Sequence, residues 1–318
     1  MSLSKPLITG AGGFIGSHLA RYLGKLNEVE VIYLADLPNN LRLNEFRNSS
    51  KFRIIEGNLS EGNTVDLPTD TTAIFALAAF NGTGRFYSQP YSVLINSMQP
   101  TLRVINEYAG KVPIVYSSSS EVYASTVEKF KWEVPTDELV PPSIDSIHNT
   151  RWSYASAKLF GEIALVAAGA ELGAMGTIVR YHNVYGPNMG WDHFIPDFVT
   201  RALDGRFEIT GADQTRAFMH VTDAVRGTIA ALSKASTSIP IYHLGTKEEM
   251  TILAAANLIL AEMGLDKNEI SLRPAPKGSV SRRCANPTKA EIELEWSARI
   301  DFREGIKDFL QSFISLKP

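Results

Sequence analysis

The chain has little cysteine and little net charge. Cys284 is the single cysteine among 318 residues, so no disulfide can form within the chain. A protein without disulfides suits a reducing interior, and we expect a cytoplasmic protein. The formal net charge is -3, which gives no overall attraction to nucleic acid or to an anionic membrane surface. We therefore expect neither kind of partner, and any phosphate has to be bound by local groups.

A long uninterrupted apolar run is also lacking. The most apolar long segment, residues 163–179, is broken by three glycines and contains Glu171. It is too short and too interrupted to span a bilayer. Residues 1–6 show no charged region, apolar stretch and cleavage site, so no secretion signal is expected. The sequence does contain 44% hydrophobic residues, enough for the core of an enzyme-sized globular protein.

The first half of the chain alternates short apolar β-type runs with helical patterns, which is the arrangement of βαβ units. The predicted strands are residues 6–9, 29–35, 52–56, 72–77, 112–117 and 176–181. The clearest predicted helices are residues 14–25, 93–109 and 154–172. This order predicts an α/β fold, a Rossmann-type doubly wound parallel sheet. After Tyr181 the alternation becomes irregular, which predicts a smaller C-terminal lobe interleaved with the core.

A glycine-rich turn joins the first predicted strand to the first predicted helix. Its residues run Thr9-Gly10-Ala11-Gly12-Gly13-Phe14-Ile15-Gly16. The glycines let the backbone turn sharply and approach a pyrophosphate, while the helix N-terminus supplies N–H donors. Three glycines near a turn can also form only a tight loop, but the strand before and the helix after favour a dinucleotide site. The predicted contacts here are Gly10, Gly13, Phe14, Ile15 and Gly16.

Asp36 ends the second predicted strand, about twenty residues beyond the last glycine. Its carboxylate can accept hydrogen bonds from both ribose hydroxyls of an adenosine and would repel a 2′-phosphate, so NAD is favoured over NADP. A surface aspartate in a turn is the alternative. Other cofactor contacts are predicted from position; they are Asn58, Leu59, Leu77, Ala78, Ala79, Asn96, Ser117, Tyr181 and Val184.

Polar side chains follow the fifth predicted strand, at the sheet edge where open α/β sheets bind ligands. About thirty residues later come Tyr154 and Lys158, whose four-residue spacing puts both side chains on one face of a helix. We expect the lysine to lower the tyrosine pKa toward neutrality, so that the phenolate can take a proton from an alcohol. The polar residues after the strand are a run of serines at 117–120, which could also form only a flexible turn. The Tyr-x-x-x-Lys spacing also occurs by chance in helices.

The order of these motifs resembles the extended short-chain dehydrogenase/reductases, specifically the NAD-dependent epimerase/dehydratase family acting on nucleotide sugars. The resemblance covers essentially the whole chain. It implies bound NAD and a catalytic set of Ser119, Tyr154 as base, and Lys158 on the nicotinamide ribose. A sugar hydroxyl, usually on carbon 4, would lose a hydride to NAD and a proton to the tyrosine, and the hydride would later be returned. A homodimer through the helices at 93–109 and 154–172 is expected by the same resemblance.

Three later segments resemble the nucleotide-sugar part of this family. They supply Asn183 in residues 180–187, Arg216 in residues 215–223 and Arg283 in residues 281–283. Two separated arginines offer planar forks suited to a diphosphate, although each alone could be a surface arginine. Residues 1–181 are thus expected to form the NAD-binding domain with the catalytic residues, and residues 182–318 mainly the nucleotide-sugar-binding lobe.

Glu121 bears on what happens to the oxidised sugar. Family 4,6-dehydratases carry Asp-Glu where this chain has Ser120-Glu121, so loss of water is disfavoured, whereas uronate decarboxylases carry Ser-Glu. Residues 78–84 and 182–187, with Trp191, resemble GDP-mannose 3,5-epimerases. Two proton-transfer residues of those enzymes match Glu121 and Asp192 here, with His193 adjacent.

We predict an NAD-dependent nucleotide-sugar epimerase with Glu121 as a further catalytic residue. The predicted substrate contacts are Ser119, Ser120, Glu121, Asn183, Asp192, His193, Arg216 and Arg283. A nucleotide-uronate decarboxylase or a dehydratase remains the alternative, as do an NADPH-dependent reductase and a binding protein without turnover. Glu121 could also be only a helix cap, and Asp192 and His193 could only line a loop.

Overall fold

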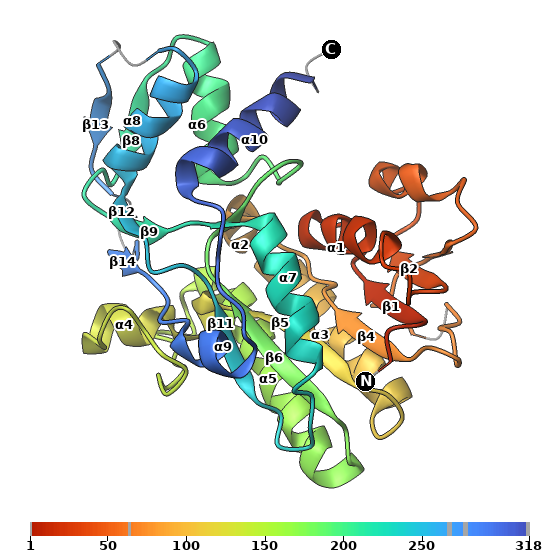
Figure 1. The fold of residues 1–318 in the computed structure, drawn as a ribbon. Helices are drawn as coiled ribbons and strands as arrows, with labels where there is room; N and C mark the ends of the chain where they lie inside the picture. Colours follow the sequence, from red (N-terminus) through yellow and green to blue (C-terminus); the bar gives the residue numbers. More distant parts are fainter. Residues whose placement is uncertain (1, 63–64, 266–268, 276–278, 316–318) are drawn as a thin grey trace.

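A seven-stranded parallel sheet forms the centre of the molecule in this computed structural model (Figure 1). The structure describes residues 2–62, 65–265, 269–275 and 279–315. The strand order is β11-β6-β5-β4-β1-β2-β3, and every neighbouring pair is parallel. The strands are β1 (Pro6–Thr9), β2 (Ile32–Asp36), β3 (Phe52–Glu56), β4 (Ala73–Ala76), β5 (Ile114–Ser119), β6 (Gly176–Tyr181) and β11 (Ile241–Leu244). The predicted Rossmann-type α/β fold is confirmed.

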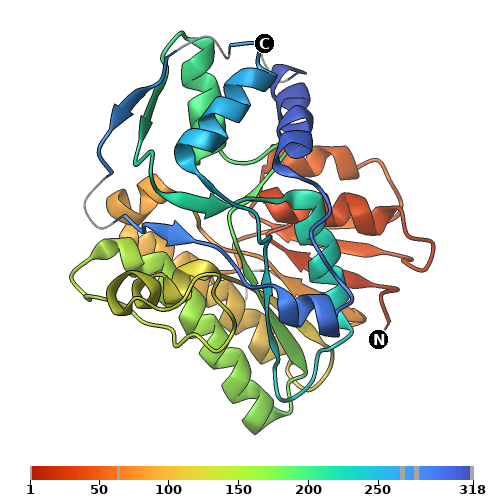
Figure 2. The same ribbon diagram turned by 60° about the vertical axis from the view of Figure 1, so that its left-hand side comes forward.

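Helices cover both faces of this sheet. On one face lie α1 (Phe14–Gly24) and α7 (Val221–Leu232), and on the other α3 (Pro90–Tyr108) and α5 (Ser153–Leu172) (Figures 1 and 2). Each face has its own buried apolar cluster. Leu19 and Val225 belong to the first, and Val104 and Leu165 belong to the second. Burial on both faces explains why the strands are almost continuously apolar rather than alternating.

Short elements follow the carboxyl ends of the strands, where the predicted site lies. They are η1 (Leu41–Phe46), α2 (Thr83–Ser88), η2 (Ser120–Tyr123), α4 (Ala124–Phe130) and η3 (Thr150–Trp152). Helix α5 begins directly after η3, and its first turn carries Tyr154. The sheet edge is therefore surrounded by loops and single turns that can reach a ligand.

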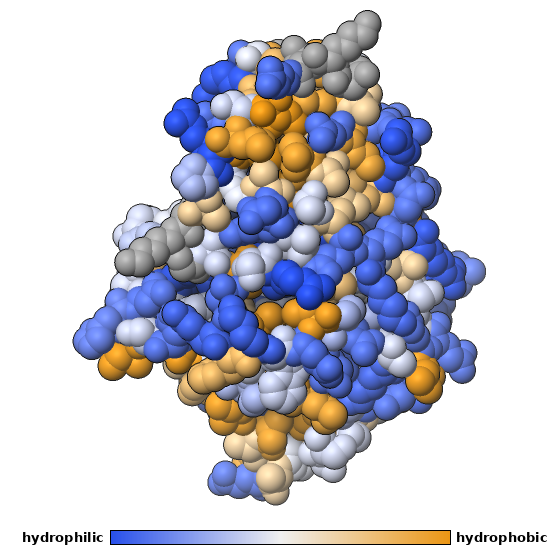
Figure 3. Space-filling model, turned by 90° about the vertical axis from the view of Figure 1, so that its left-hand side faces the viewer, coloured by the Kyte–Doolittle hydropathy of each residue, from blue (hydrophilic) through white to orange (hydrophobic). Residues whose placement is uncertain are grey.

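A second group of elements packs around its own apolar cluster, in which Phe198, Ile259 and Phe309 are buried. The helices are α6 (Phe194–Leu203), α8 (Ile252–Glu262) and α10 (Phe302–Ser315), with α9 (Thr288–Glu293) nearer the sheet. The strands are β7 (Val184–Tyr185), β8 (Glu208–Thr210), β9 (Thr215–Ala217), β10 (Met219–His220), β12 (Glu249–Thr251), β13 (Ser271–Arg273) and β14 (Arg282–Arg283). Figure 3 shows apolar residues gathered on the upper part of the face that this group presents.

The chain returns to the central sheet after entering this group. Helix α7 packs on β6, and β11 pairs with β6 along Ile241 to Leu244. The sequence pattern did not predict β11, because it lies in the part of the chain after Tyr181 where the alternation of strands and helices is irregular. The division of roles at residue 181 stays a prediction. Within the described part of the chain, no helix is both long and apolar enough to cross a membrane.

Candidate active site

The glycine-rich turn between β1 and α1 leaves no space for larger side chains. Gly10 has φ +70°, and its N–H donates to the carbonyl of Ala35 at 2.9 Å. A Cβ on Gly10 would lie 2.8 Å from the Ala78 Cα, and one on Gly16 would lie 2.2 Å from the Gly10 carbonyl oxygen. Backbone atoms cause both clashes, so only glycine fits these positions.

The N-terminus of α1 is open to an anion. Gly13 is the N-cap residue and has no side chain to accept a hydrogen bond, and the first turn contains no acidic residue. The first N–H groups of a helix have no partner inside the helix and carry positive potential, so they suit a phosphate. Arg42 lines the cavity into which this N-terminus opens, and burial lowers the pKa of the Arg42 guanidinium. The sequence analysis missed Arg42, because the sequence of η1 contains no motif that identifies this arginine as a ligand contact.

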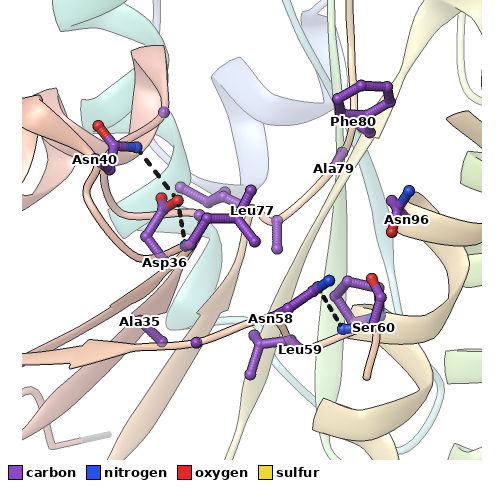
Figure 4. A pocket seen from close by; sticks show the side chains of 16 residues that line it. Ala35, Asp36, Asn40, Asn58, Leu59, Ser60, Leu77, Ala79, Phe80 and Asn96 are labelled. Carbon is purple, nitrogen blue, oxygen red and sulfur yellow. Dashed lines mark hydrogen bonds between the residues drawn. The ribbon is translucent and has the colours of Figure 1, made fainter. Parts of the chain in front are cut away.

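Asp36 lies at the rim of a cavity of about 320 Å³ beside the glycine turn (Figure 4). Its Oδ2 accepts the Gly12 N–H at 2.7 Å, and its Oδ1 accepts the Leu37 N–H at 2.7 Å and the Asn40 amide at 3.3 Å. The carboxylate therefore holds the glycine turn and also faces the cavity. Predicted cofactor residues that line this cavity are Gly10, Gly13, Asp36, Asn58, Leu59, Leu77, Ala78, Ala79 and Asn96.

A second cavity of about 520 Å³ continues from the first across the carboxyl end of β1. The two cavities share Gly10, Gly13, Leu77 and Ala79. The second adds the predicted residues Phe14, Ile15, Gly16, Ser117, Tyr154, Lys158 and Tyr181. Together they form one groove, in which a dinucleotide can lie with its pyrophosphate at the N-terminus of α1.

Tyr154 and Lys158 lie side by side at the far end of this groove. The Tyr154 ring stacks on Phe86 of α2, with ring centroids 5.3 Å apart and planes 12° from parallel. The Lys158 Nζ lies 5.8 Å from the centre of the Tyr154 ring. It donates to the Ser117 carbonyl at 2.7 Å and to the Ser117 hydroxyl at 3.2 Å. Both side chains are therefore fixed in one orientation.

The pKa values of this pair differ from the sequence-based expectation. Burial raises the pKa of Tyr154, and the negative charge of Glu121 raises it further. Burial also lowers the pKa of Lys158 to about 7, against the opposing effect of Glu162. The expected lowering of the tyrosine pKa was wrong, because burial of the phenol is the largest influence on it and acts in the opposite direction.

Ser119, the last residue of β5, and the two residues after it do not line the walls of the groove. The Ser119 Oγ accepts the Glu121 N–H at 3.3 Å and so caps η2. Ser120 is buried and faces a small cavity with Tyr123 and Cys284. The predicted substrate contacts at Ser119, Ser120 and Glu121 stay predictions.

Glu121 is held by arginines from distant parts of the chain. Its Oε1 lies 2.8 Å from Arg283 Nη2, and its Oε2 lies 3.3 Å from Arg151 Nη1. Burial alone would raise the pKa of Glu121, but the charges of Arg283, Arg151 and Arg216 outweigh burial and lower it. Glu121 is therefore an ionised carboxylate in a cationic cluster. The sequence analysis did not place Arg151 in the site, because its separation from Glu121 gave no signal.

A third cavity of about 510 Å³ adjoins the groove on the side of the C-terminal group. It is lined by the predicted substrate residues Asn183, Asp192, His193, Arg216 and Arg283. Val184, predicted as a cofactor contact, lines this cavity and not the groove. Trp191, Asp192 and His193 line both this cavity and the groove, so the two spaces meet at this loop.

Two arginines, Arg216 and Arg283, and two aspartates, Asp192 and Asp197, line the third cavity. Arg216 donates to the Thr215 carbonyl at 2.7 Å and to the Val280 carbonyl at 2.9 Å. Burial and the nearby Arg283 lower the pKa of Arg216 to about 9. The Nε of Arg283 is buried and has no hydrogen-bond partner among the described residues. The buried guanidinium groups of Arg216 and Arg283, with the unpartnered Nε of Arg283, favour an anionic ligand beside these two side chains.

Comparison with known proteins agrees with this arrangement. A model of the NAD dependent epimerase/dehydratase family matches residues 6–245. The UDP-N-acetyl-alpha-D-glucosaminuronate decarboxylase of Bacillus cytotoxicus is 28% identical, covering 96% of this chain and 97% of the relative. A dTDP-glucose 4,6-dehydratase from an Actinoplanes species is also 28% identical, covering 96% of each chain.

A solved structure shares the fold over nearly the whole length. The UDP-glucuronic acid 4-epimerase of Bacillus cereus, in complex with UDP-glucuronic acid and NAD, superposes with a TM-score of 0.85 at 24% identity. The match covers 98% of this chain and 100% of that chain. The chain belongs to the NAD-dependent epimerase/dehydratase family, and NAD is the cofactor of that family.

Proposed function

We propose that this member of the NAD-dependent epimerase/dehydratase family epimerises a nucleotide-diphosphate sugar through transient oxidation of the hydroxyl on carbon 4. The observation that carries the proposal is the position of Tyr154 and Lys158. They line the groove beside the glycine turn, and this groove meets the arginine-lined third cavity at residues 191–193. A sugar whose diphosphate occupies that cavity would bring its hydroxyl to the phenol.

The residues of the groove fit bound NAD. The open N-terminus of α1 and Arg42 face the pyrophosphate position, and Asp36 faces the adenosine ribose. When bound, NAD supplies the hydride acceptor and returns the same hydride later. Tyr154 takes the hydroxyl proton as general base, and protonated Lys158 stabilises the Tyr154 phenolate. The hydroxyl of Ser119 can donate to the oxygen that becomes the ketone.

The third cavity supplies the grip on the nucleotide part of the substrate. Arg216 and Arg283 are the cations that line it, and planar guanidinium groups bind phosphate oxygens in pairs. Neutralising these arginines with a diphosphate would also relieve the repulsion between them. This role supports a nucleotide-diphosphate substrate over a sugar without one.

The electrostatics of Glu121 bear on the step after oxidation. A dehydratase needs a protonated acid beside the sugar. Ser120 stands where the family dehydratases carry an aspartate, and the two arginines hold Glu121 in its ionised form, so neither residue supplies that acid. Inversion at carbon 4 needs no second acid, because the ketone only has to present its other face before the hydride returns. The pairing of Glu121 therefore supports epimerisation over loss of water.

Decarboxylation of a nucleotide-linked uronic acid is the second candidate. Arg151 adds a cation next to Glu121 at the end of the site near Tyr154, where a sugar carboxylate could be held. A ketone on carbon 4 makes the carboxylate on carbon 5 a β-keto acid, which loses carbon dioxide without a further acid. The decarboxylase from Bacillus cytotoxicus matches this chain over 96% of its length.

One incubation separates these reactions. The purified protein is incubated in deuterated water with UDP-, GDP-, dTDP-, CDP- and ADP-sugars, both neutral and uronic, and Tyr154→Phe is the control. A product inverted at carbon 4 without deuterium supports the proposal. Deuterium at carbon 3 or 5 indicates inversion there, and release of carbon dioxide indicates decarboxylation. Absence of turnover on the whole panel would contradict the proposed function.

Assembly is a separate proposal that rests on α3 and α5. These helices pack against each other and expose large apolar side chains, with Tyr91 75% and Ile163 60% exposed. We propose that two copies pair through this face, since exposed apolar patches of this kind mark interaction sites. Light scattering that reports a monomer at micromolar concentration would refute it.

A further inference from the structure

A buried ion pair lies one helical turn beyond Lys158. Arg180 of β6 donates from Nε and Nη2 to the two carboxylate oxygens of Glu162 of α5, at 2.8 and 2.7 Å. Glu162 is 4% exposed and Arg180 is 3% exposed. The hydroxyl of Ser118 donates to the same carboxylate. The Glu162 carboxylate is therefore fixed from the strand side by three donors.

Glu162 and Lys158 point toward the same part of the sheet. They are four residues apart on α5, so their side chains lie on one face of the helix. Lys158 bonds to Ser117 and Glu162 bonds to Ser118, which are consecutive residues of β5. The ammonium and the carboxylate thus lie one strand residue apart in a site shielded from water.

The other titratable groups around the ammonium carry no charge near neutral pH. Tyr116 of β5 lies under the Lys158 Nζ at 5.1 Å, and Tyr154 and Tyr181 line the same cavity. Burial raises the pKa of all three phenols. The three tyrosines therefore bring no negative charge to the ammonium.

Charged groups of neighbouring elements act elsewhere. Glu121 of η2 acts on Tyr154, where it raises the pKa of the phenol, and it is paired with two arginines. Arg180 of β6 is engaged with Glu162. Among the described residues, Glu162 is the charged group that raises the pKa of Lys158 against its burial.

We propose that Glu162 is a positioning residue for the reaction: its carboxylate, held in place by Arg180 and Ser118, keeps the Lys158 ammonium protonated beside Tyr154. The catalytic part of this inference rests on the proposed function, because it assigns Tyr154 the role of base. Loss of the carboxylate makes the lysine neutral at a lower pH. A neutral lysine no longer stabilises the Tyr154 phenolate, so the tyrosine becomes harder to ionise.

The first test measures Lys158 without any substrate. The protein is produced with lysine carrying carbon-13 at the ε position, the Lys158 signal is assigned with Lys158→Met, and the pKa is read by NMR. We expect about 7 in the wild type, and a value lower by about one unit in Glu162→Gln. Arg180→Met is the matched control, because it breaks the same ion pair but keeps the carboxylate and its hydrogen bond from Ser118. There the Lys158 pKa should not fall.

Two results would overturn the proposal. One is an unchanged Lys158 titration in a folded Glu162→Gln protein. The other is an equal fall of the Lys158 pKa in Glu162→Gln and in Arg180→Met, which would mean that the ion pair only stabilises the fold. If either single variant fails to fold, the double variant Glu162→Gln/Arg180→Met replaces it, since uncharged replacement of both partners of a buried pair is often tolerated. Its Lys158 pKa should also lie below that of the wild type, and an unchanged value contradicts the proposal.

Kinetics then test the consequence for catalysis. With a substrate found on the sugar panel, the acidic limb of the kcat profile should move about one pH unit upward in Glu162→Gln, while KM changes little. Glu162→Asp keeps a carboxylate, so the acidic limb of its profile should lie between those of Glu162→Gln and the wild type. A shifted lysine titration in a protein that acts on no nucleotide sugar would contradict the proposed function and leave the electrostatic role of Glu162 intact. A shifted titration with an unmoved rate profile would overturn the positioning role.

Discussion

Replacement of Gly16 by alanine tests whether the glycine turn is shaped for a phosphate. The new Cβ would lie 2.2 Å from the Gly10 carbonyl oxygen and 2.9 Å from the Ala11 Cα, whereas ordinary contacts begin at 3.4 Å. Both neighbours are backbone atoms of the turn, so α1 has to move away from it by about 1 Å. This movement takes the N–H groups of α1 away from the position that the pyrophosphate requires.

The expected magnitude follows from the opposing effects of the substitution. Alanine in a helix is favoured over glycine by up to about 1 kcal/mol, while overpacking costs about 1–3 kcal/mol, so the fold loses a small amount of stability. Each hydrogen bond to a charged phosphate contributes about 1.5–3 kcal/mol, so losing one weakens NAD binding about 10- to 100-fold.

The assay is titration calorimetry of NAD, together with thermal unfolding and circular dichroism. Gly84→Ala is the matched control, since a Cβ on Gly84 of α2 would meet nothing within 4 Å. We expect normal NAD affinity and equal or higher stability for this control. Equal NAD affinity in Gly16→Ala and the wild type would refute the account of the glycine turn as a phosphate site.

Three further substitutions test other parts of the site. Tyr154→Phe should lower turnover by about 10²- to 10⁴-fold with NAD affinity nearly unchanged, and a loss of folding instead would mean that the phenol is structural. Asp36→Ala should weaken NAD binding about 10-fold or more and narrow the preference for NADH over NADPH in fluorescence titrations; an unchanged preference would contradict the role of this carboxylate. The folded-state pKa of Glu121 is lowered from 4.5, so its ion pairs stabilise the fold above that pH and are lost as the pH falls through the folded-state pKa. The difference in unfolding midpoint between the wild type and Glu121→Gln should therefore shrink from pH 6 to pH 3, and a constant difference would argue against these pairs.

The local part of the site could be predicted from the sequence because it depends on neighbours along the chain. The glycine turn, Asp36 at the end of β2, and the four-residue spacing of Tyr154 and Lys158 each follow from the geometry of one strand or one helix. These residues line the cavities as a continuous groove, although their roles remain predictions.

The remaining part depends on contacts between distant segments. Glu121 meets Arg151 and Arg283 only after folding, so its ionised state could not be inferred from Ser120-Glu121 alone. The pKa error at Tyr154 has the same origin, because burial of a side chain is decided by the packing of α2, α5 and β6. A helical spacing shows that two groups can meet, and says nothing about how much water remains around them.

The late arrival of β11 in the sheet has a consequence for synthesis on the ribosome. Strand β6 carries Tyr181 and is buried along its whole length, with β5 on one side and β11 on the other. A nascent chain that ends soon after residue 181 has β6 but not β11, and its backbone groups on that side are open to pairing with another chain. The strand that carries Tyr181 of the groove therefore gains its second neighbour only once residue 244 has emerged, and we expect chains that terminate in between to aggregate.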